Sequence, residues 1–395
     1  MSGQSHHGSI LGCILLITGC CIGAGMLGMP VITATAGFIP STVIMLLCCV
    51  FMYITGLLLL EATLWFQEDV NLLSLARHTL GTPGQIITWG CFVFLFYCLC
   101  VAYTIGCGEI LGPLFQSETL GAAVALTFVG ILIYAGTRTV DYLNRGLMVG
   151  LIITYCLLVA SGASYVDTSN LQITHWDASL ASIPLLLISF GYQNLVPSMT
   201  HYLRRDVRKI RISMALGMAL TFVIYVIWET VILGILPASG ESVQTVMDKG
   251  QMVTELLQNT SRIPYIIPLS KGFALFAITT SLLANSLTCV HFLHDGLRRY
   301  VGKTNHVALI IATLLPPFII AVLDPNSFLS ALSIAGGTAT VIIFGILPAV
   351  VVWHGRYKEN RPGQILGGGK TALILVIAFS SLVLGLEIAR QLGVY

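Results

Sequence analysis

The first long apolar run of the chain is interrupted in its middle by four glycines and a proline, between Gly19 and Pro30. In hydrocarbon, a backbone N–H or C=O that leaves a helix costs several kcal/mol unless another group binds it. A membrane helix broken at mid-depth is therefore expected only where it is buried in protein or lines a polar cavity. A second apolar run, residues 183–199, is interrupted in a similar way between Ser189 and Asn194. Two interrupted helices in corresponding places of two halves are typical of the binding site of a secondary transporter.

The composition indicates an all-α polytopic membrane protein. Only 9% of the residues are charged, against about 25% in soluble domains, and the mean hydropathy is +0.90. Because each membrane helix needs about 20 apolar residues, we expect one transmembrane domain over residues 1–395 with eleven spans and no large soluble domain. The predicted spans are 9–36, 38–66, 85–113, 119–136, 146–166, 180–203, 211–236, 264–292, 306–323, 327–353 and 371–391. The first span lacks a basic leader and a small-residue cleavage pattern, so we do not expect it to be a signal peptide.

The distribution of basic residues predicts the orientation. Fifteen lysines and arginines fall in loops on one side of the predicted bilayer, and only Lys249 and Arg262 fall on the other. Loops rich in Lys and Arg stay in the cytoplasm. We therefore expect a multi-pass membrane protein with a cytoplasmic N-terminus and an external C-terminus.

The spacing of the two breaks predicts an inverted repeat. The interrupted spans are the first and the sixth, so each half holds five spans and the halves cross the membrane in opposite directions. The expected repeats are residues 9–166 and 180–353, followed by one additional helix at 371–391. This interpretation rests on the order of the spans, because beyond the two breaks the two halves show no similarity in sequence.

The ends of the broken helices predict the chemistry of a ligand. The outer half of span 1 begins near Gly25, where free amides and the helix dipole favour an anion. Gly23, Ala24 and Gly25 would let a carboxylate approach the backbone closely. The outer half of span 6 ends near Ser189 and Phe190, whose carbonyls would favour a cation. An α-amino acid carries both charges. The alternative is that the glycines only let neighbouring helices pack closely.

Several motifs together resemble the hydroxy and aromatic amino acid permease family, and within it the bacterial tyrosine and tryptophan transport proteins. They are Ile22 to Pro30, Gly37-Phe38, Leu57 to Glu61, Ser189 to Tyr192, Val196 to Ser198, Arg208 to Arg211 and Tyr225 to Trp228. The resemblance implies the LeuT-like five-plus-five inverted-repeat fold of the amino acid–polyamine–organocation superfamily, with eleven helices and proton-driven uptake. In that superfamily the span 6 break often reads Gly-aromatic-Glu. Here Gln193 takes the third place, which argues against a coupling carboxylate at this point.

In this fold, spans 3, 6, 8 and 10 form the walls of the substrate pocket. Aromatic side chains there would stack on a substrate ring, and small residues would make room for it. The predicted wall residues are Phe94, Tyr97, Cys98, Phe190, Gly191, Tyr192, Asn285 and Gly337. These predict tyrosine ahead of phenylalanine, and tryptophan where the space at Gly337 is deep enough. The alternative is that the aromatic residues only pack or lie at the membrane interface.

Ionisable residues at membrane depth are candidates for ion coupling. Glu109, Glu229 and Lys271 are all predicted in outer halves of spans, and a Glu109–Lys271 or Glu229–Lys271 ion pair is the expected arrangement, because a lone buried charge is costly. Glu61 lies near the inner end of span 2, where we expect a structural or gating pair with a loop arginine.

Hydroxyl groups on span 8 leave sodium coupling open. Thr280 and Ser281 would be the leading ligands, since this helix holds sodium in related transporters. Threonine and serine also bond the carbonyls of their own helix, and no complete sodium cage is evident. We therefore expect protons as the coupling ion.

Other function classes fit the sequence less well. A channel or uniporter would need a continuous polar pore, and an enzyme or ATP-driven pump would need a catalytic cluster or a phosphate-binding loop. The predicted partners are a small amino acid, a coupling ion and the lipid bilayer, with no nucleic acid, no cofactor and no metal site. Transport of another neutral amino acid such as serine or threonine is the main alternative. The sequence carries no prediction of oligomeric state.

Overall fold

The computed structural model describes residues 9–67, 70–236, 241–260, 265–301 and 305–393. All regular elements within these ranges are helical. The first half holds α1 (Ile10–Cys21), α2 (Gly25–Thr33), α3 (Phe38–Leu64), α4 (Leu72–Phe115), α5 (Glu118–Ala135), α6 (Thr137–Ala163), η1 (Asn170–Gln172) and η2 (Asp177–Ser182). The second half holds α7 (Ile183–Ser189), η3 (Gln193–Leu195), α8 (Val196–Tyr202), α9 (Val207–Ile235), α10 (Glu241–Asp248), α11 (Val253–Thr260), α12 (Ile266–Val301), α13 (His306–Leu323), α14 (Phe328–Ile334), η4 (Ala335–Ile346), α15 (Leu347–Tyr357) and α16 (Gly369–Gln391).

The helices confirm the eleven predicted spans. Ten segments of the described chain are long and apolar enough to cross a membrane, and α1 with α2 forms one further span bent by 58°. In α4, a short helix and span 3 are joined at Gly81, whose φ of +74° is one that glycine adopts easily. The chain is therefore a multi-pass membrane protein.

Both predicted breaks are present. In span 1, α1 ends at Cys21 and α2 begins at Gly25. In span 6, α7 ends at Ser189, and a 3₁₀ turn precedes α8. A proline lies in the first turn of both α7 and α8, where its missing N–H removes no helical hydrogen bond. Both helices therefore break at the places that the sequence predicts, although Pro30 of span 1 lies inside α2.

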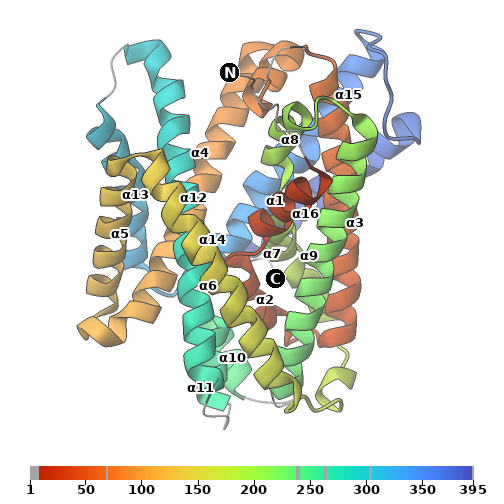
Figure 1. Cartoon of the computed structure of the whole chain (residues 1–395). Helices are drawn as coiled ribbons and strands as arrows, with labels where there is room; N and C mark the ends of the chain where they lie inside the picture. Colours follow the sequence, from red (N-terminus) through yellow and green to blue (C-terminus); the bar gives the residue numbers. More distant parts are fainter. Residues whose placement is uncertain (1–8, 68–69, 237–240, 261–264, 302–304, 394–395) are drawn as a thin grey trace.

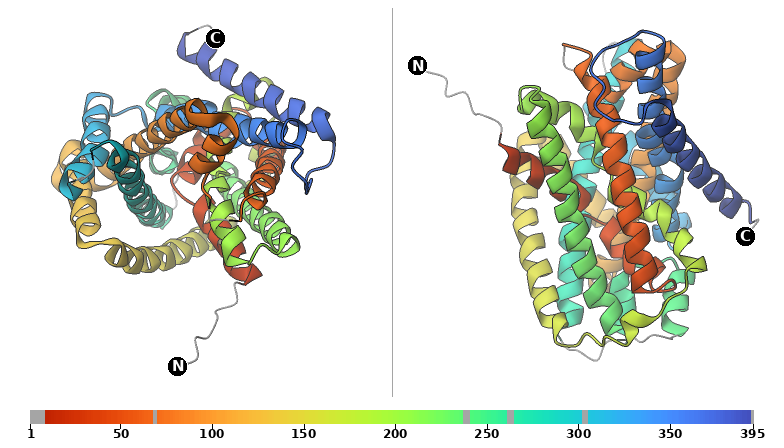
Figure 2. Two further views of the ribbon diagram at one scale, coloured as in Figure 1. Left: turned by 90° about the horizontal axis from the view of Figure 1, so that it is seen from above. Right: turned by 90° about the vertical axis from the view of Figure 1, so that its right-hand side faces the viewer.

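α2 and α7 are buried among intact helices, whereas one side of α1 is exposed at the edge of the bundle. Figure 1 shows α3 and α9 on one side of α1 and α2, and α5 and α13 at the opposite edge. α10 and α11 lie at one end of the bundle, and the start of α4 and α8 lie at the other (Figure 1). We call these the outer and inner ends, after the predicted orientation. α16 packs along η4 at the margin of the bundle (Figure 2).

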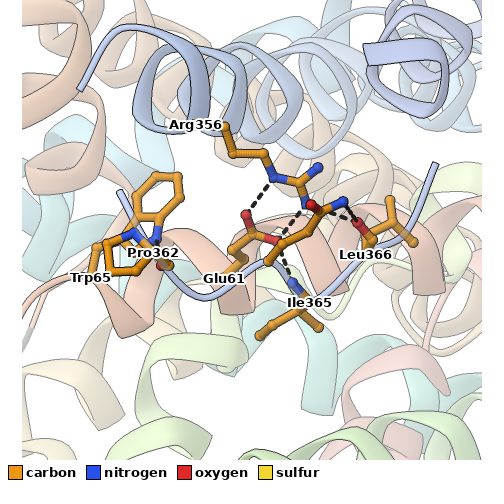
Figure 3. Close-up of polar contacts among 7 residues, drawn as sticks. Glu61, Trp65, Arg356, Pro362, Ile365 and Leu366 are labelled. Atoms are coloured by element: carbon orange, nitrogen blue, oxygen red, sulfur yellow. Dashed lines mark hydrogen bonds and ion pairs between the residues drawn. The ribbon is translucent and has the colours of Figure 1, made fainter. Parts of the chain in front are cut away.

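A buried ion pair joins span 2 to the last turn of α15, at the end of span 10 (Figure 3). Arg356 binds both carboxylate oxygens of Glu61, with Nε to Oε1 and Nη2 to Oε2 both at 2.6 Å. The amide of Ile365 donates to Glu61 Oε2 at 2.8 Å, and Arg356 Nη2 also donates to the carbonyl of Leu366. The predicted pairing of Glu61 with an arginine is therefore confirmed, and it anchors the loop that leads to α16.

Candidate functional site

A central cavity of 220 Å³ lies at the level of the two breaks. Its walls come from spans 1, 3, 5, 6, 8 and 10. They are Gly19, Cys20, Ile22, Phe92, Leu95, Phe96, Leu99, Tyr103, Asn144, Met148, Ile188, Gly191, Asn194, Thr280, Ser281, Ala284, Asn285, Thr288 and Phe344. Since each break contributes residues to it, the cavity lies where the sequence predicts a ligand site.

One side of the cavity is aromatic. The rings of Phe92 and Phe96 on α4 are 5.9 Å apart, and Phe344 of η4 meets Phe92 edge-on at 6.2 Å. Phe292 of α12 packs against both α4 rings, at 5.4 and 5.6 Å. The cluster offers ring faces and edges to a flat apolar group, which is the geometry that aromatic side chains prefer.

Other residues that line the cavity are polar. Thr280, Ser281 and Asn285 of α12 line it, and Asn144 of α6 borders it. Asn285 Nδ2 donates to the Phe96 carbonyl at 3.0 Å, which fixes its amide between α12 and α4. Asn144 Oδ1 is buried and has no hydrogen-bond partner among the described residues. The cavity therefore offers an apolar and a polar wall to one ligand.

A second cavity of 420 Å³ continues towards the inner end. It shares Phe92, Phe96, Asn194 and Thr288 with the central cavity, and it reaches Asn71 just before α4. At the outer end, the indole of Trp228 donates to the Met26 carbonyl at 2.9 Å, and α11 packs on α2. The site is therefore open towards the inner end and covered on the outer side.

Three consecutive backbone amides are free at the span 1 break. Within the described residues, the amides of Gly23, Ala24 and Gly25 donate no hydrogen bond, whereas the next amide, that of Met26, donates to the Gly23 carbonyl at 3.1 Å. They directly follow Ile22, which lines the cavity. Free amides at the start of a helix are a site for an anionic group.

The carbonyls at the breaks were expected to be free for a cation, but a hydroxyl group of span 7 contacts them. The hydroxyl of Tyr225 lies 2.6 Å from the Cys21 carbonyl and 2.9 Å from the Ser189 carbonyl. The Ser189 carbonyl is thus not left free for a cation. Its neighbour Phe190 is fully buried, with its ring 5.1 Å from that of Tyr225. The motif Tyr225 to Trp228 therefore braces both broken helices, a role that the sequence did not reveal.

The glycines at the break also bring helices together. A Cβ at Gly23 would lie 2.6 Å from Ser281 Oγ, and one at Gly25 would overlap Ser189 Oγ. Ala24, between them, is buried. Close packing of the two breaks and free amides therefore occur at the same residues, so the packing alternative and the ligand-binding alternative do not exclude each other.

The predicted wall of span 3 lies on the wrong face of the helix. Phe94 is 46% exposed on the outside of the bundle, and the Tyr97 hydroxyl donates to the Ala312 carbonyl of α13 at 2.7 Å. Cys98 is half-buried and does not line the cavity. The cavity face of α4 instead carries Phe92, Leu95, Phe96, Leu99 and Tyr103. Their spacing of three or four residues is that of one helix face, and this signal was present in the sequence.

Two other predicted wall residues also lie elsewhere. Tyr192 is fully buried, and its hydroxyl overlaps the place of a Cβ on Gly56 of α3. A Cβ at Gly337 would lie 2.7 Å from the side chain of Glu387 on α16. Gly337 therefore makes room for span 11, and Phe344 forms the span 10 part of the wall. Of the predicted residues, Gly191, Thr280, Ser281 and Asn285 do line the cavity.

The predicted ion pairs with Lys271 are absent from the described residues. Glu229 lies against Thr33, with Oε2 and Oγ1 2.7 Å apart, and Thr254 Oγ1 donates to Glu109 Oε1 at 3.3 Å. Neither carboxylate reaches Lys271. The sequence predicts similar depths in the membrane for these three residues, but their side chains face different neighbours.

One of the predicted sodium ligands has a partner within span 8. Thr280 donates to the Ala277 carbonyl of its own helix at 3.0 Å, the bond that threonine commonly makes in helices. The described residues contain no group of three or more His, Cys, Asp or Glu side chains arranged to hold a metal ion.

Comparisons with known proteins agree with this architecture. The chain is 28% identical to a tryptophan-specific transport protein of Haemophilus influenzae, covering 99% of this chain and 98% of the relative. It is 29% identical to tyrosine-specific transport system 1 of the same organism, covering 97% of each. A crystal structure of the Eremococcus coleocola manganese transporter shares the fold, with a TM-score of 0.65, 13% identity and coverage of 100% of this chain and 90% of that one. The tryptophan/tyrosine permease family matches residues 6–387, and the chain belongs to this family.

Proposed function

We propose that this protein imports aromatic amino acids, tyrosine first, across the bacterial inner membrane by proton symport. Its family and its named relatives support the substrate class. The observation that carries the proposal is the central cavity, which adjoins both broken helices and has a phenylalanine-rich wall. A polar end and an aromatic end in one cavity match the two ends of an aromatic amino acid.

The free amides are the proposed carboxylate site. Gly23, Ala24 and Gly25 would each contribute a donor to the substrate carboxylate, helped by the dipole of α2. The ammonium group would lie at the end of α7, where Ile188 and Gly191 line the cavity. Ser189 and Phe190 support this site by packing, since the Ser189 carbonyl already has a donor.

The substrate ring would lie against Phe92, Phe96 and Phe344. Each ring pair contributes roughly 0.5–1.5 kcal/mol beyond the buried area. The hydroxyl of tyrosine needs a polar partner, because an unmatched buried polar group costs about 1–3 kcal/mol. Asn144 and Asn285 offer such partners in the same cavity, which favours tyrosine over phenylalanine.

Transport would follow alternating access. The inward-open arrangement described above is one of its states, with the two five-span repeats, 9–166 and 180–353, moving relative to each other. The charge distribution of the loops supports a cytoplasmic N-terminus and an external C-terminus. Tags at the two termini of the protein in intact cells test this orientation. A C-terminal tag that is reachable only after permeabilisation would contradict it.

The test of function is uptake of labelled tyrosine by purified protein in proteoliposomes. An inward proton gradient without sodium should drive accumulation, and tyrosine methyl ester should compete poorly because it lacks the negative charge. Uptake that requires sodium at a fixed pH gradient would instead support coupling at Thr280 and Ser281. Stronger competition by serine than by any aromatic amino acid would support the alternative substrate class.

Phe344 and Phe94 provide a matched pair of variants. Phe344→Trp places a larger ring in a cavity of 220 Å³ and should raise the KM for tyrosine strongly. Phe94→Trp changes a ring on the outside of the bundle and should leave the KM unchanged. Equal effects of the two substitutions would contradict the proposed aromatic wall.

A further inference from the structure

We propose that Glu229 of α9 is the residue that binds the coupling proton, and that this proton holds the outer half of span 1 against span 7. The inference rests on the proposed proton symport and assigns a residue to it. It comes from the hydrogen bonding of a carboxyl group that is buried inside the bundle, away from the central cavity.

Glu229 is almost completely enclosed, with 1% of its surface exposed. Its one polar side-chain contact among the described residues is Thr33, near the outer end of α2, with Oε2 2.7 Å from Thr33 Oγ1. The other oxygen, Oε1, is buried and has no hydrogen-bond partner. An ionised carboxylate in this place would have one unsatisfied oxygen and no compensating charge.

The two contacts of the Thr33 hydroxyl favour a protonated carboxyl in this conformation. Thr33 Oγ1 lies 2.8 Å from the Met29 carbonyl and 2.7 Å from Glu229 Oε2. The hydroxyl has one hydrogen, and a carbonyl can only accept. If Thr33 donates to Met29, then Oε2 must carry a proton and donate it to Thr33. A protonated Glu229 satisfies both short contacts, whereas an ionised one leaves two acceptors with a single hydrogen.

The helices packed against α9 supply no positive charge that would stabilise an ionised Glu229. No Lys, Arg or His of the described chain lies within ion-pair distance of it, and α2 holds no titratable residue. The titratable groups that approach α9 have other partners. The Tyr155 hydroxyl of α6 donates to the Ile224 carbonyl, and the Cys49 thiol of α3 donates to the Met218 carbonyl. Asp167 accepts a hydrogen bond from Ser169. Cys21 of α1 is buried beside Tyr225, and His201 of α8 also has a partner.

The contact lies where the outer side of the carrier closes. On the same helix, Trp228 binds the Met26 carbonyl and Tyr225 binds the Cys21 carbonyl. Glu229 adds the outermost attachment of span 1 to span 7. Loss of its proton would leave an unpaired buried charge, which costs several kcal/mol. Closure of the outer half therefore requires proton uptake from the outer side.

The position of Glu229 also gives the proton a short way to the inner side. Tyr225 lies one turn further in on the same face of α9, about 6 Å along the helix axis. Its hydroxyl contacts both breaks, at Cys21 and Ser189, whose neighbours Ile22 and Ile188 line the central cavity. The proton would be bound from outside when the outer half is open and released towards this cavity after substrate leaves.

The test compares Glu229→Gln with Glu109→Gln in proteoliposomes. Glutamine keeps the shape of a protonated carboxyl and can donate to Thr33, so Glu229→Gln should retain counterflow of labelled tyrosine and lose accumulation above equilibrium under a proton gradient. Glu109 is the rival candidate, since it is also a glutamate in an outer half and also bonded to a threonine. Loss of accumulation with retained counterflow in Glu109→Gln, but not in Glu229→Gln, would overturn the assignment to Glu229.

A second variant keeps the test decisive if Glu229→Gln fails to fold. Thr33→Val keeps the carboxyl but removes its hydrogen-bond partner, so proton-driven accumulation should persist with a shifted pH dependence. Accumulation by Glu229→Gln equal to wild type, or an unchanged pH profile for Thr33→Val, would overturn the assignment. If the wild-type protein itself accumulates tyrosine only with sodium, the proposed function fails instead.

Discussion

Removal of one hydroxyl group, in Tyr225→Phe, should destabilise the protein measurably because that group braces both breaks. The hydroxyl contacts the Cys21 carbonyl at 2.6 Å and the Ser189 carbonyl at 2.9 Å. Both carbonyls lie at helix ends and have few other donors. The T-shaped contact with Phe190, at 5.1 Å between ring centroids, needs only the ring and remains in the variant. The change therefore isolates the hydrogen bonds.

The expected loss of stability follows from the number of hydrogen-bond donors removed. One hydroxyl hydrogen is shared by two buried carbonyls, so about one hydrogen bond is lost and a buried polar group stays unmatched, at about 1–3 kcal/mol. Polar contacts between membrane helices are often weaker, with an average near 0.6 kcal/mol, which favours the lower part of this range. A loss of about 1 kcal/mol corresponds to about a fivefold change in an equilibrium constant.

Tyr155→Phe is the matched control. The Tyr155 hydroxyl donates to the Ile224 carbonyl at 3.0 Å, but Ile224 lies inside α9, where its carbonyl already accepts the helical bond from Trp228. Reversible unfolding in mixed detergent micelles measures both variants. Tyr225→Phe should lose more free energy of unfolding than Tyr155→Phe, and it should also bind tyrosine more weakly. Equal losses would refute the view that span 7 satisfies the two breaks.

Three other substitutions test separate parts of the structure. Gly337→Leu should lower tyrosine and tryptophan uptake alike, in line with the amount of folded protein, because the leucine side chain would collide with Glu387. A selective loss of tryptophan uptake would instead place Gly337 in the substrate pocket. A thiol reagent that enters from the inner end should inactivate the wild type but not Cys20→Ser, since Cys20 is exposed in the cavity. Excess tyrosine should slow this inactivation, and a rate unchanged by tyrosine would contradict substrate binding in the cavity. Glu61→Gln should cost about 3–5 kcal/mol of stability, because it leaves the buried Arg356 without its partner; wild-type resistance to SDS unfolding would contradict this.

The number of spans and the two breaks could be predicted from sequence because their causes are local. A run of about 20 apolar residues is enough to specify a membrane helix, and clustered glycines weaken a helix locally, although Pro30 and Pro113 remain inside helices. The same holds for the free amides from Gly23 to Gly25, since any helix that restarts at Gly25 leaves its first amides without carbonyl partners. The pairing of Glu61 with an arginine was also predictable, because Glu61 lies near the inner end of span 2, on the side of the arginine-rich loops.

Only the tertiary structure decided which side of each helix faces the cavity. Phe94 lies two residues from both Phe92 and Phe96, and two residues turn an α-helix by about 200°, so a small error in register exchanges the cavity wall for the outside of the bundle. Gly337 was equally ambiguous, since a glycine makes room for whichever helix is next to it, and here that helix is α16. The contact of Thr33 with Glu229 joins residues 196 positions apart. No local pattern encodes such a pair, because it depends on how the two broken helices pack against span 7.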